Sequence, residues 1–130
     1  MIYCVEDDDS IRELMLYTLK ASGFEGRGFA EAGELWQALE EAKSGRVPMP
    51  RLVMLDIMLP GEDGISILQK LRADGVTADV PVIMATAKGT EYDKVKGLDL
   101  GADDYLAKPF GMMEMVSRSK AVRRRSEPKE

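Results

Sequence analysis

The sequence contains no histidine and only one cysteine, Cys4. Imidazole-based catalysis and histidine metal sites are therefore excluded. A single cysteine cannot form a disulfide framework, so we expect a reducing, cytoplasmic location. No apolar run is long enough to span a bilayer, and residues 1–5 lead directly into acidic residues instead of forming a signal peptide. Neither a membrane nor a secretory route is expected.

A basic excess is also missing, because 23 Asp and Glu residues outnumber 18 Lys and Arg residues and give a net charge of -5. A nucleic-acid-binding surface is therefore not the default interpretation. The 130 residues, of which 45% are hydrophobic and 32% charged, suit one soluble domain with a single core. We place that domain at residues 1–122. Residues 123–130 are polar without apolar periodicity and are expected to form the end of a helix that runs into a linker or tail.

Short apolar runs alternate with helical patterns along the chain. The runs predict strands near residues 2–5, 25–29, 52–55, 80–85 and 105–107. Apolar residues three or four positions apart predict a helix after each strand. The stripe of the first helix is predicted to consist of Ile11, Leu14, Met15, Thr18 and Leu19. The (βα)5 alternation predicts an α/β fold with a parallel sheet and helices on both faces.

Chemically active side chains follow four of the predicted strands. Glu6 and Asp7 follow the first strand, Asp56 the third, Thr86 the fourth and Lys108 the fifth. In open sheets of this kind, sites lie beyond the carboxyl ends of the strands, so these residues should converge. Three converging carboxylates repel one another unless a cation neutralises them, and Mg²⁺ prefers carboxylate, water and phosphate oxygens. The set suits one transferring phosphoryl group, with Asp56 as the nucleophile and Lys108 and Thr86 stabilising charge.

Each residue taken alone has a simpler explanation. Acidic residues after a strand are often only loop or helix N-terminal residues. Asp56 could be a turn former, Thr86 could open a helix, and Lys108 could be a solvated lysine. These explanations do not account for the joint pattern at four strand ends, which favours phosphoryl transfer.

Four segments of the chain resemble the signature blocks of two-component response-regulator receiver domains. These segments are residues 5–8, 55–64, 85–87 and 101–110. The resemblance covers nearly the whole chain and implies a flavodoxin-like (CheY-like), doubly wound (βα)5 fold with parallel strand order 2-1-3-4-5. It also implies a cis Lys108–Pro109 peptide bond that aims the lysine into the site. The implied Mg²⁺ ligands are Glu6, Asp7, Asp56 and the backbone carbonyl of Met58.

The resemblance also implies partners. The phosphoryl donor would be a phosphohistidine on a sensor histidine kinase, and the chain would catalyse only its own phosphorylation and dephosphorylation. The match is most similar to the OmpR/PhoB type, in which a winged-helix DNA-binding domain follows and controls transcription. That output domain is missing from the 130 residues, so we expect a truncated form or a stand-alone receiver, with DNA contacted only through the missing domain.

Phosphorylation in the resembled family drives homodimerisation through the fourth helix, fifth strand and fifth helix. The matching positions here are Lys94, Asp103, Asp104, Glu114, Arg118, Lys120 and Arg125. A solvated charged face is the alternative. As a switch, we expect Thr86 to move inward to the phosphoryl group and Tyr105 to fill the vacated space, unless Tyr105 is ordinary strand filler. Ser119 departs from the family pattern, since it is polar on the apolar stripe of the last helix.

Three other functions are alternatives to a phosphoacceptor role. A haloacid-dehalogenase-like phosphatase needs a second aspartate two residues after its nucleophile, where this chain has Met58. A flavodoxin-like cofactor binder needs a phosphate-binding loop after the first strand, where residues 6–9 are all acidic. An interaction module without phosphorylation stays open. Because Met58 offers no side-chain hydrogen bond to a hydrolytic water, we expect a long-lived phosphoryl group.

Overall fold

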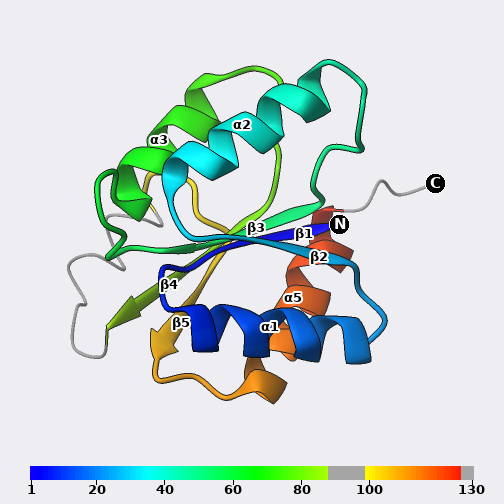
Figure 1. Ribbon diagram of the computed structural model, residues 1–130, viewed down its shortest axis with the longest axis vertical. Helices are drawn as coiled ribbons and strands as arrows, with labels where there is room; N and C mark the ends of the chain where they lie inside the picture. The colour runs from blue at the N-terminus through cyan, green and yellow to red at the C-terminus, as the bar shows by residue number, and fades with distance from the viewer. Residues whose placement is uncertain (88–98, 127–130) are drawn as a thin grey trace.

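The computed structural model describes residues 1–87 and 99–126 (Figure 1). The predicted fourth helix, including Lys94, lies outside the described residues. No helix in the described part of the chain is long and apolar enough to cross a membrane.

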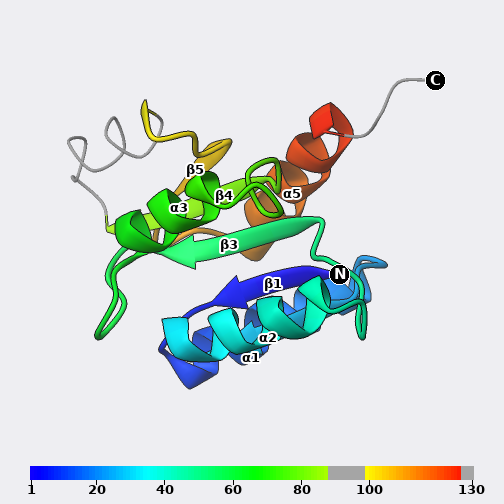
Figure 2. The ribbon, with the colours of Figure 1, turned by 90° about the horizontal axis from the view of Figure 1, so that it is seen from above.

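A five-stranded parallel sheet, with strand order β2-β1-β3-β4-β5, forms the middle layer of the fold. The strands are β1 (Ile2–Val5), β2 (Gly26–Phe29), β3 (Leu52–Asp56), β4 (Val82–Ala87) and β5 (Asp104–Lys108). The arrowheads of β1 and β3 point the same way in Figure 2, as their parallel pairing requires. The predicted flavodoxin-like topology is therefore confirmed.

Helices cover both faces of this sheet. The described helices are α1 (Asp9–Ala21), α2 (Ala32–Lys43), α3 (Gly64–Ala73) and α5 (Met112–Ser126). Figure 1 shows α2 and α3 on one face and α1 and α5 on the other. Each face buries its own apolar cluster. Every residue of β3 is buried, as expected for a central parallel strand that is covered on both sides.

The apolar face of α1 differs from the prediction. Met15 and Leu19 are buried, but Leu14 is 49% exposed, and Leu16 packs toward the sheet instead. The reason lies in β2, where a Cβ built at Gly28 would lie 2.8 Å from Cδ1 of Leu16. Glycine at this position leaves room for the Leu16 side chain, and Leu14, two residues earlier and therefore on the opposite side of α1, is exposed.

Helix α5 accommodates its polar residue, Ser119, and extends to Ser126. Ser119 is fully buried, and its hydroxyl donates to the carbonyl oxygen of Met115 at 2.8 Å, which satisfies the polar group inside the core. The helix continues to Ser126, in keeping with the helix end expected after residue 122, and the domain boundary itself stays a prediction. Arg123, predicted to lie in the tail, packs its guanidinium 4.9 Å from the ring centroid of Phe24.

Candidate functional site

Three predicted site residues meet at the carboxyl ends of the strands. Glu6 directly follows β1, Asp56 ends β3 and Lys108 ends β5. The ammonium nitrogen Nζ of Lys108 lies 2.6 Å from Oε1 of Glu6 and 2.5 Å from Oδ2 of Asp56. The Glu6 and Asp56 side chains are only 3% and 6% exposed, so one ammonium pairs with two nearly buried carboxylates and offsets one of their two negative charges. The Lys108–Pro109 peptide bond is cis, as expected.

The remaining carboxylate oxygens are held by backbone amides. Oδ1 of Asp56 accepts a hydrogen bond from the N–H of Met58 at 2.9 Å. Oε2 of Glu6 accepts one from the N–H of Asp8 at 3.1 Å. The backbone carbonyl of Glu6 accepts from Nη1 of Arg12 at 2.7 Å. The orientation of both carboxylates is thus fixed by groups next to them in the chain.

A third carboxylate completes the acidic cluster. Asp7 is exposed, and one oxygen each from Glu6, Asp7 and Asp56 lies within 4.8 Å of the others. Hard oxygen donors of this kind suit Mg²⁺, whereas the soft thiolate and imidazole ligands of other metals are not part of the cluster. The donor set therefore fits the predicted ion. The assignment of the Met58 carbonyl as a further ligand stays a prediction.

The electrostatics of the site favour a charged lysine. Burial raises the pKa of Glu6, although hydrogen bonds from Lys108 and from the amide of Asp8 act in the opposite direction. Burial lowers the pKa of Lys108, but its hydrogen bonds with Asp56 and Glu6 outweigh that effect and raise the pKa above its ordinary value. Lys108 is therefore a cation at neutral pH.

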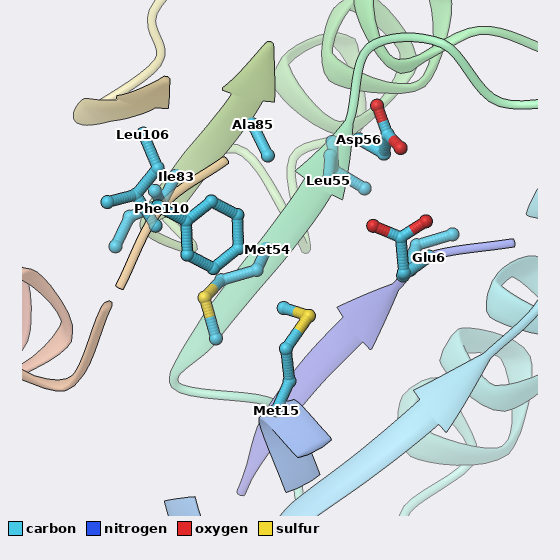
Figure 3. Close-up of a pocket in the computed structure, with 10 residues that line it drawn as sticks. Glu6, Met15, Met54, Leu55, Asp56, Ile83, Ala85, Leu106 and Phe110 are labelled. Atoms are coloured by element: carbon cyan, nitrogen blue, oxygen red, sulfur yellow. The ribbon is translucent and has the colours of Figure 1, made fainter. Parts of the chain in front are cut away.

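A small apolar pocket lies beneath the carboxylates. Figure 3 shows Glu6 and Asp56 at its rim, with Met15, Met54 and Phe110 as its floor. Carbon and sulfur atoms on this side screen charge poorly, so charges at the rim interact more strongly than they would in water.

The two predicted switch residues lie on neighbouring strands. Thr86 is 5% exposed and lies within β4, not after it as predicted, and Tyr105 is 5% exposed in the core. The predicted strand began at residue 80, but β4 begins only at Val82. Pro81 has no N–H for a sheet ladder, although its carbonyl accepts from Val53 at 2.9 Å. The strand therefore starts and ends about two residues later than the apolar run suggests.

Four of the predicted dimer residues, Asp103, Asp104, Glu114 and Arg118, form side-chain contacts within the chain. Nη1 of Arg118 lies 3.0 and 3.1 Å from the two carboxylate oxygens of Asp104, and the Arg118 guanidinium also pairs with Glu114 at 3.3 Å. Oδ2 of Asp103 accepts from the N–H of Val82 at 2.8 Å, which gives Asp103 a structural role at the start of β4. Among the described members of the predicted face, Asp103, Glu114, Lys120 and Arg125 are exposed, whereas Asp104 and Arg118 are half-buried.

One structurally important residue, Arg72 on α3, was missed by the sequence analysis. Its guanidinium donates to the carbonyl oxygens of Ala78, Val80 and Gly101 at 2.7 to 3.0 Å and to Asp103 at 3.1 Å. These bonds tie α3 to the segments that precede β4 and β5. A solitary arginine on a helix gives no sequence signal for such a role.

Comparison with known proteins identifies relatives over nearly the whole chain. The family model described as "Response regulator receiver domain" matches residues 2–120. The phosphate regulon transcriptional regulatory protein PhoB of Escherichia coli K12 is 43% identical over 127 residues, which cover 98% of this chain and 53% of PhoB. The DNA-binding dual master transcriptional regulator RpaA of Synechocystis is 40% identical over 129 residues, or 97% of this chain and 50% of RpaA. The chain thus spans about half the length of these curated relatives.

Solved structures agree with this grouping. A response regulator from Chloroflexus aurantiacus is similar with a TM-score of 0.82 and 35% identity, covering 95% of this chain and 96% of that one. NtrX from Brucella abortus gives a TM-score of 0.85 and 28% identity over 96% of this chain and 27% of its own. The sequence and the backbone are therefore both similar to response regulators.

Proposed function

Because this chain belongs to the response regulator receiver domain family and is homologous to transcriptional response regulators, we propose that Asp56 is its phosphoacceptor. The donor is a phosphohistidine on a sensor histidine kinase. The observation that carries the proposal is the contact of Lys108 with both Asp56 and Glu6 at the strand ends. A nearly buried carboxylate next to a fixed cation is suited to accept a phosphoryl group.

The chemistry of the transfer follows from the positions of these groups. A carboxylate oxygen of Asp56 forms a bond to phosphorus while the bond between phosphorus and the donor nitrogen breaks, and the electron pair of that bond stays on the donor. The N–H of Met58 holds Oδ1 and thereby orients the carboxylate, while Lys108 is placed to stabilise negative charge on the phosphoryl oxygens. The chain modifies only itself in this scheme and does not turn over an external substrate.

A divalent ion belongs to the proposal. Receiver domains bind Mg²⁺ at an acidic pocket, and the cluster of Glu6, Asp7 and Asp56 provides the matching donors. We assign these three carboxylates, with the backbone carbonyl of Met58, as the ligands. Bound there, Mg²⁺ supplies positive charge for the phosphoryl oxygens.

The test is direct phosphorylation with a small donor. The chain is incubated with acetyl phosphate and Mg²⁺ and its intact mass is measured. We expect the mass of one added phosphoryl group in the wild type and in Asp79→Ala, which changes an exposed aspartate elsewhere. Asp56→Ala should gain none. Equal phosphorylation of Asp56→Ala, or no binding of beryllofluoride and Mg²⁺ by the wild type, would favour a different role, such as an interaction module.

We assign the switch to Thr86 and Tyr105. A phosphoryl group adds roughly two negative charges and several acceptor oxygens at Asp56. Thr86 follows Ala85, which pairs with Asp56 on the adjacent strand β4, and we expect its hydroxyl to donate to the phosphoryl group. Thr86→Ala should leave phosphorylation of Asp56 intact but abolish the homodimerisation that follows it. Dimerisation by the phosphorylated variant at wild-type strength, measured by sedimentation, would disprove the switch.

The output of the switch is transcription control. The curated relatives are transcriptional regulators about twice the length of this chain, and NtrX is also longer. We assign the homodimer surface to the predicted fourth helix, which lies outside the described residues, together with β5 and α5. We assign the contact with DNA to an output domain outside these 130 residues.

A further inference from the structure

The loop between β3 and α3 carries a backbone group that touches the proposed phosphoacceptor. It covers residues 57–63, and the N–H of Met58 within it donates to Oδ1 of Asp56 at 2.9 Å. The beginning of the loop is anchored to the sheet, because the N–H of Ile57 donates to the carbonyl oxygen of Ala85 at 2.9 Å. Contacts that fix the other end of the loop therefore affect the orientation of the Met58 backbone.

Glu62 holds the far side of this loop. Its Oε1 accepts a hydrogen bond from the indole Nε1 of Trp36 on α2 at 2.7 Å. Its Oε2 accepts from the hydroxyl of Ser66 at 3.0 Å and forms an ion pair with Lys70, both on α3. The Lys70 ammonium also lies 5.9 Å from the Trp36 ring centroid. One side chain thus ties the loop to two helices.

The Glu62 carboxylate is shielded and charged. The side chain is 20% exposed, and burial raises its pKa, but hydrogen bonds from Lys70, Trp36 and Ser66 outweigh burial and place the pKa below its ordinary value. An ionised acceptor forms stronger hydrogen bonds than a neutral one. The tie between loop and helices is therefore present at neutral pH.

We propose that Glu62 is a positioning residue for the Mg²⁺ ligands of the site, an inference that rests on the proposed function. By fixing the loop to α2 and α3, Glu62 holds the Met58 backbone in the orientation that meets Asp56. Outer groups that orient metal ligands typically change metal affinity when they are removed. Glu62 acts through the loop backbone and contacts no ligand itself.

Mg²⁺ binding, measured by calorimetry, tests the role directly. Glu62→Ala should weaken Mg²⁺ binding about tenfold. Glu62→Gln keeps an acceptor for the Trp36 indole and should recover part of the loss. The matched control is Glu41→Ala, which removes a glutamate of α2 that pairs with Arg27 at 3.9 Å and contributes nothing to the loop.

Trp36 provides a second readout because it is the only tryptophan in the sequence. Mg²⁺ should change the fluorescence of Trp36 in the wild type and in Glu41→Ala, and this response should be lost in Glu62→Ala even when Mg²⁺ saturates the variant. Urea unfolding measures the stability of each variant and so distinguishes the positioning role from a merely structural one. A merely structural role of Glu62 would lower stability without changing Mg²⁺ affinity in the folded chain.

The results of these experiments distinguish the positioning role of Glu62 from the proposed function of the site. Wild-type Mg²⁺ affinity and a wild-type fluorescence response in Glu62→Ala would overturn the positioning role and leave the proposed function standing. No Mg²⁺ binding by the wild type would overturn the metal part of the proposed function and the positioning role together.

Discussion

Gly64 lies so close to Asp56 that a Cβ built at Gly64 would lie 2.5 Å from the backbone carbonyl oxygen of Asp56. The same Cβ would lie 2.9 Å from the Cα of Ile57, and the Gly64 N–H donates to the Ile57 carbonyl at 3.0 Å. The neighbours are backbone atoms that cannot rotate away. The first turn of α3 therefore packs directly against the segment that carries the proposed nucleophile.

Replacing Gly64 with alanine should disturb both the fold and the site. We expect Gly64→Ala to lower the free energy of unfolding by about 1–3 kcal/mol, since an added methyl group must displace backbone. The displaced Asp56 should also accept phosphate from acetyl phosphate more slowly. Gly75→Ala is the control, because a Cβ there meets no atom within 4 Å. A wild-type phosphorylation rate in Gly64→Ala would show that the close contact does not fix Asp56.

Lys108 should stabilise the fold as well as the chemistry. Lys108→Ala leaves the Glu6 and Asp56 carboxylates without their cation, and removing one partner of a buried pair costs 3–5 kcal/mol in comparable cases. The lysine side chain is 25% exposed, so solvent screening reduces the expected loss to about 2–3 kcal/mol without Mg²⁺. Urea unfolding measures it, with the exposed Lys20→Ala as control.

Mg²⁺ should rescue the same variant. A ligand that binds only the folded chain raises its stability with concentration, and Mg²⁺ would replace the charge that Lys108 supplied. We therefore expect Mg²⁺ to stabilise Lys108→Ala more than it stabilises the wild type. Equal stabilisation of the two proteins would contradict the view that lysine and metal neutralise the same carboxylates.

The central part of the site was predictable because it depends on strand order alone. The (βα)5 pattern predicts that parallel strands end at the same edge, and the family resemblance implies the order 2-1-3-4-5, which brings the ends of β1, β3 and β5 within reach of one another. The exposure of Leu14 was not predictable in the same way. It depends on Gly28 of β2, on which α1 packs, and helical periodicity does not reveal what a helix packs against.

The sequence did not predict the roles of Arg72 and Glu62, for a different reason. Arg72 binds carbonyl oxygens in two loops, and Glu62 binds side chains of two helices. These partners are up to 29 residues apart along the chain and are brought together only by the packed fold. A lone charged residue on a helix or in a loop carries no pattern that distinguishes it from a solvated one.

The ion pair between Arg118 and Asp104 makes a prediction about the proposed dimer. Within one chain, Nη1 of Arg118 lies 3.0 Å from Oδ1 of Asp104. If the pair exchanges between subunits of a symmetric dimer, Arg118→Asp and Asp104→Arg should each prevent dimerisation of the phosphorylated chain. Mixing the two variants should restore it, since opposite charges again face each other at both positions.

Sedimentation of the phosphorylated variants, separately and mixed, measures this effect. The restored dimer should contain both variants, which native mass spectrometry distinguishes. Lys120→Ala tests whether an exposed cation of the same helix contributes independently. Failure of the mixture to dimerise would show that Arg118 and Asp104 act within one chain and not across the interface.

Met58 makes a prediction about the lifetime of the phosphoryl group. Met58 is 71% exposed and lies two residues after Asp56, and its thioether is too weak an acceptor to orient an attacking water. We expect phosphorylated Asp56 to persist well beyond seconds without a phosphatase. Met58→Asn, which adds a hydrogen-bonding amide of smaller size, should shorten the lifetime, measured by intact mass at intervals after the donor is removed. Loss within seconds from the wild type, or an unchanged lifetime in the variant, would mean that water reaches phosphorus without help from residue 58.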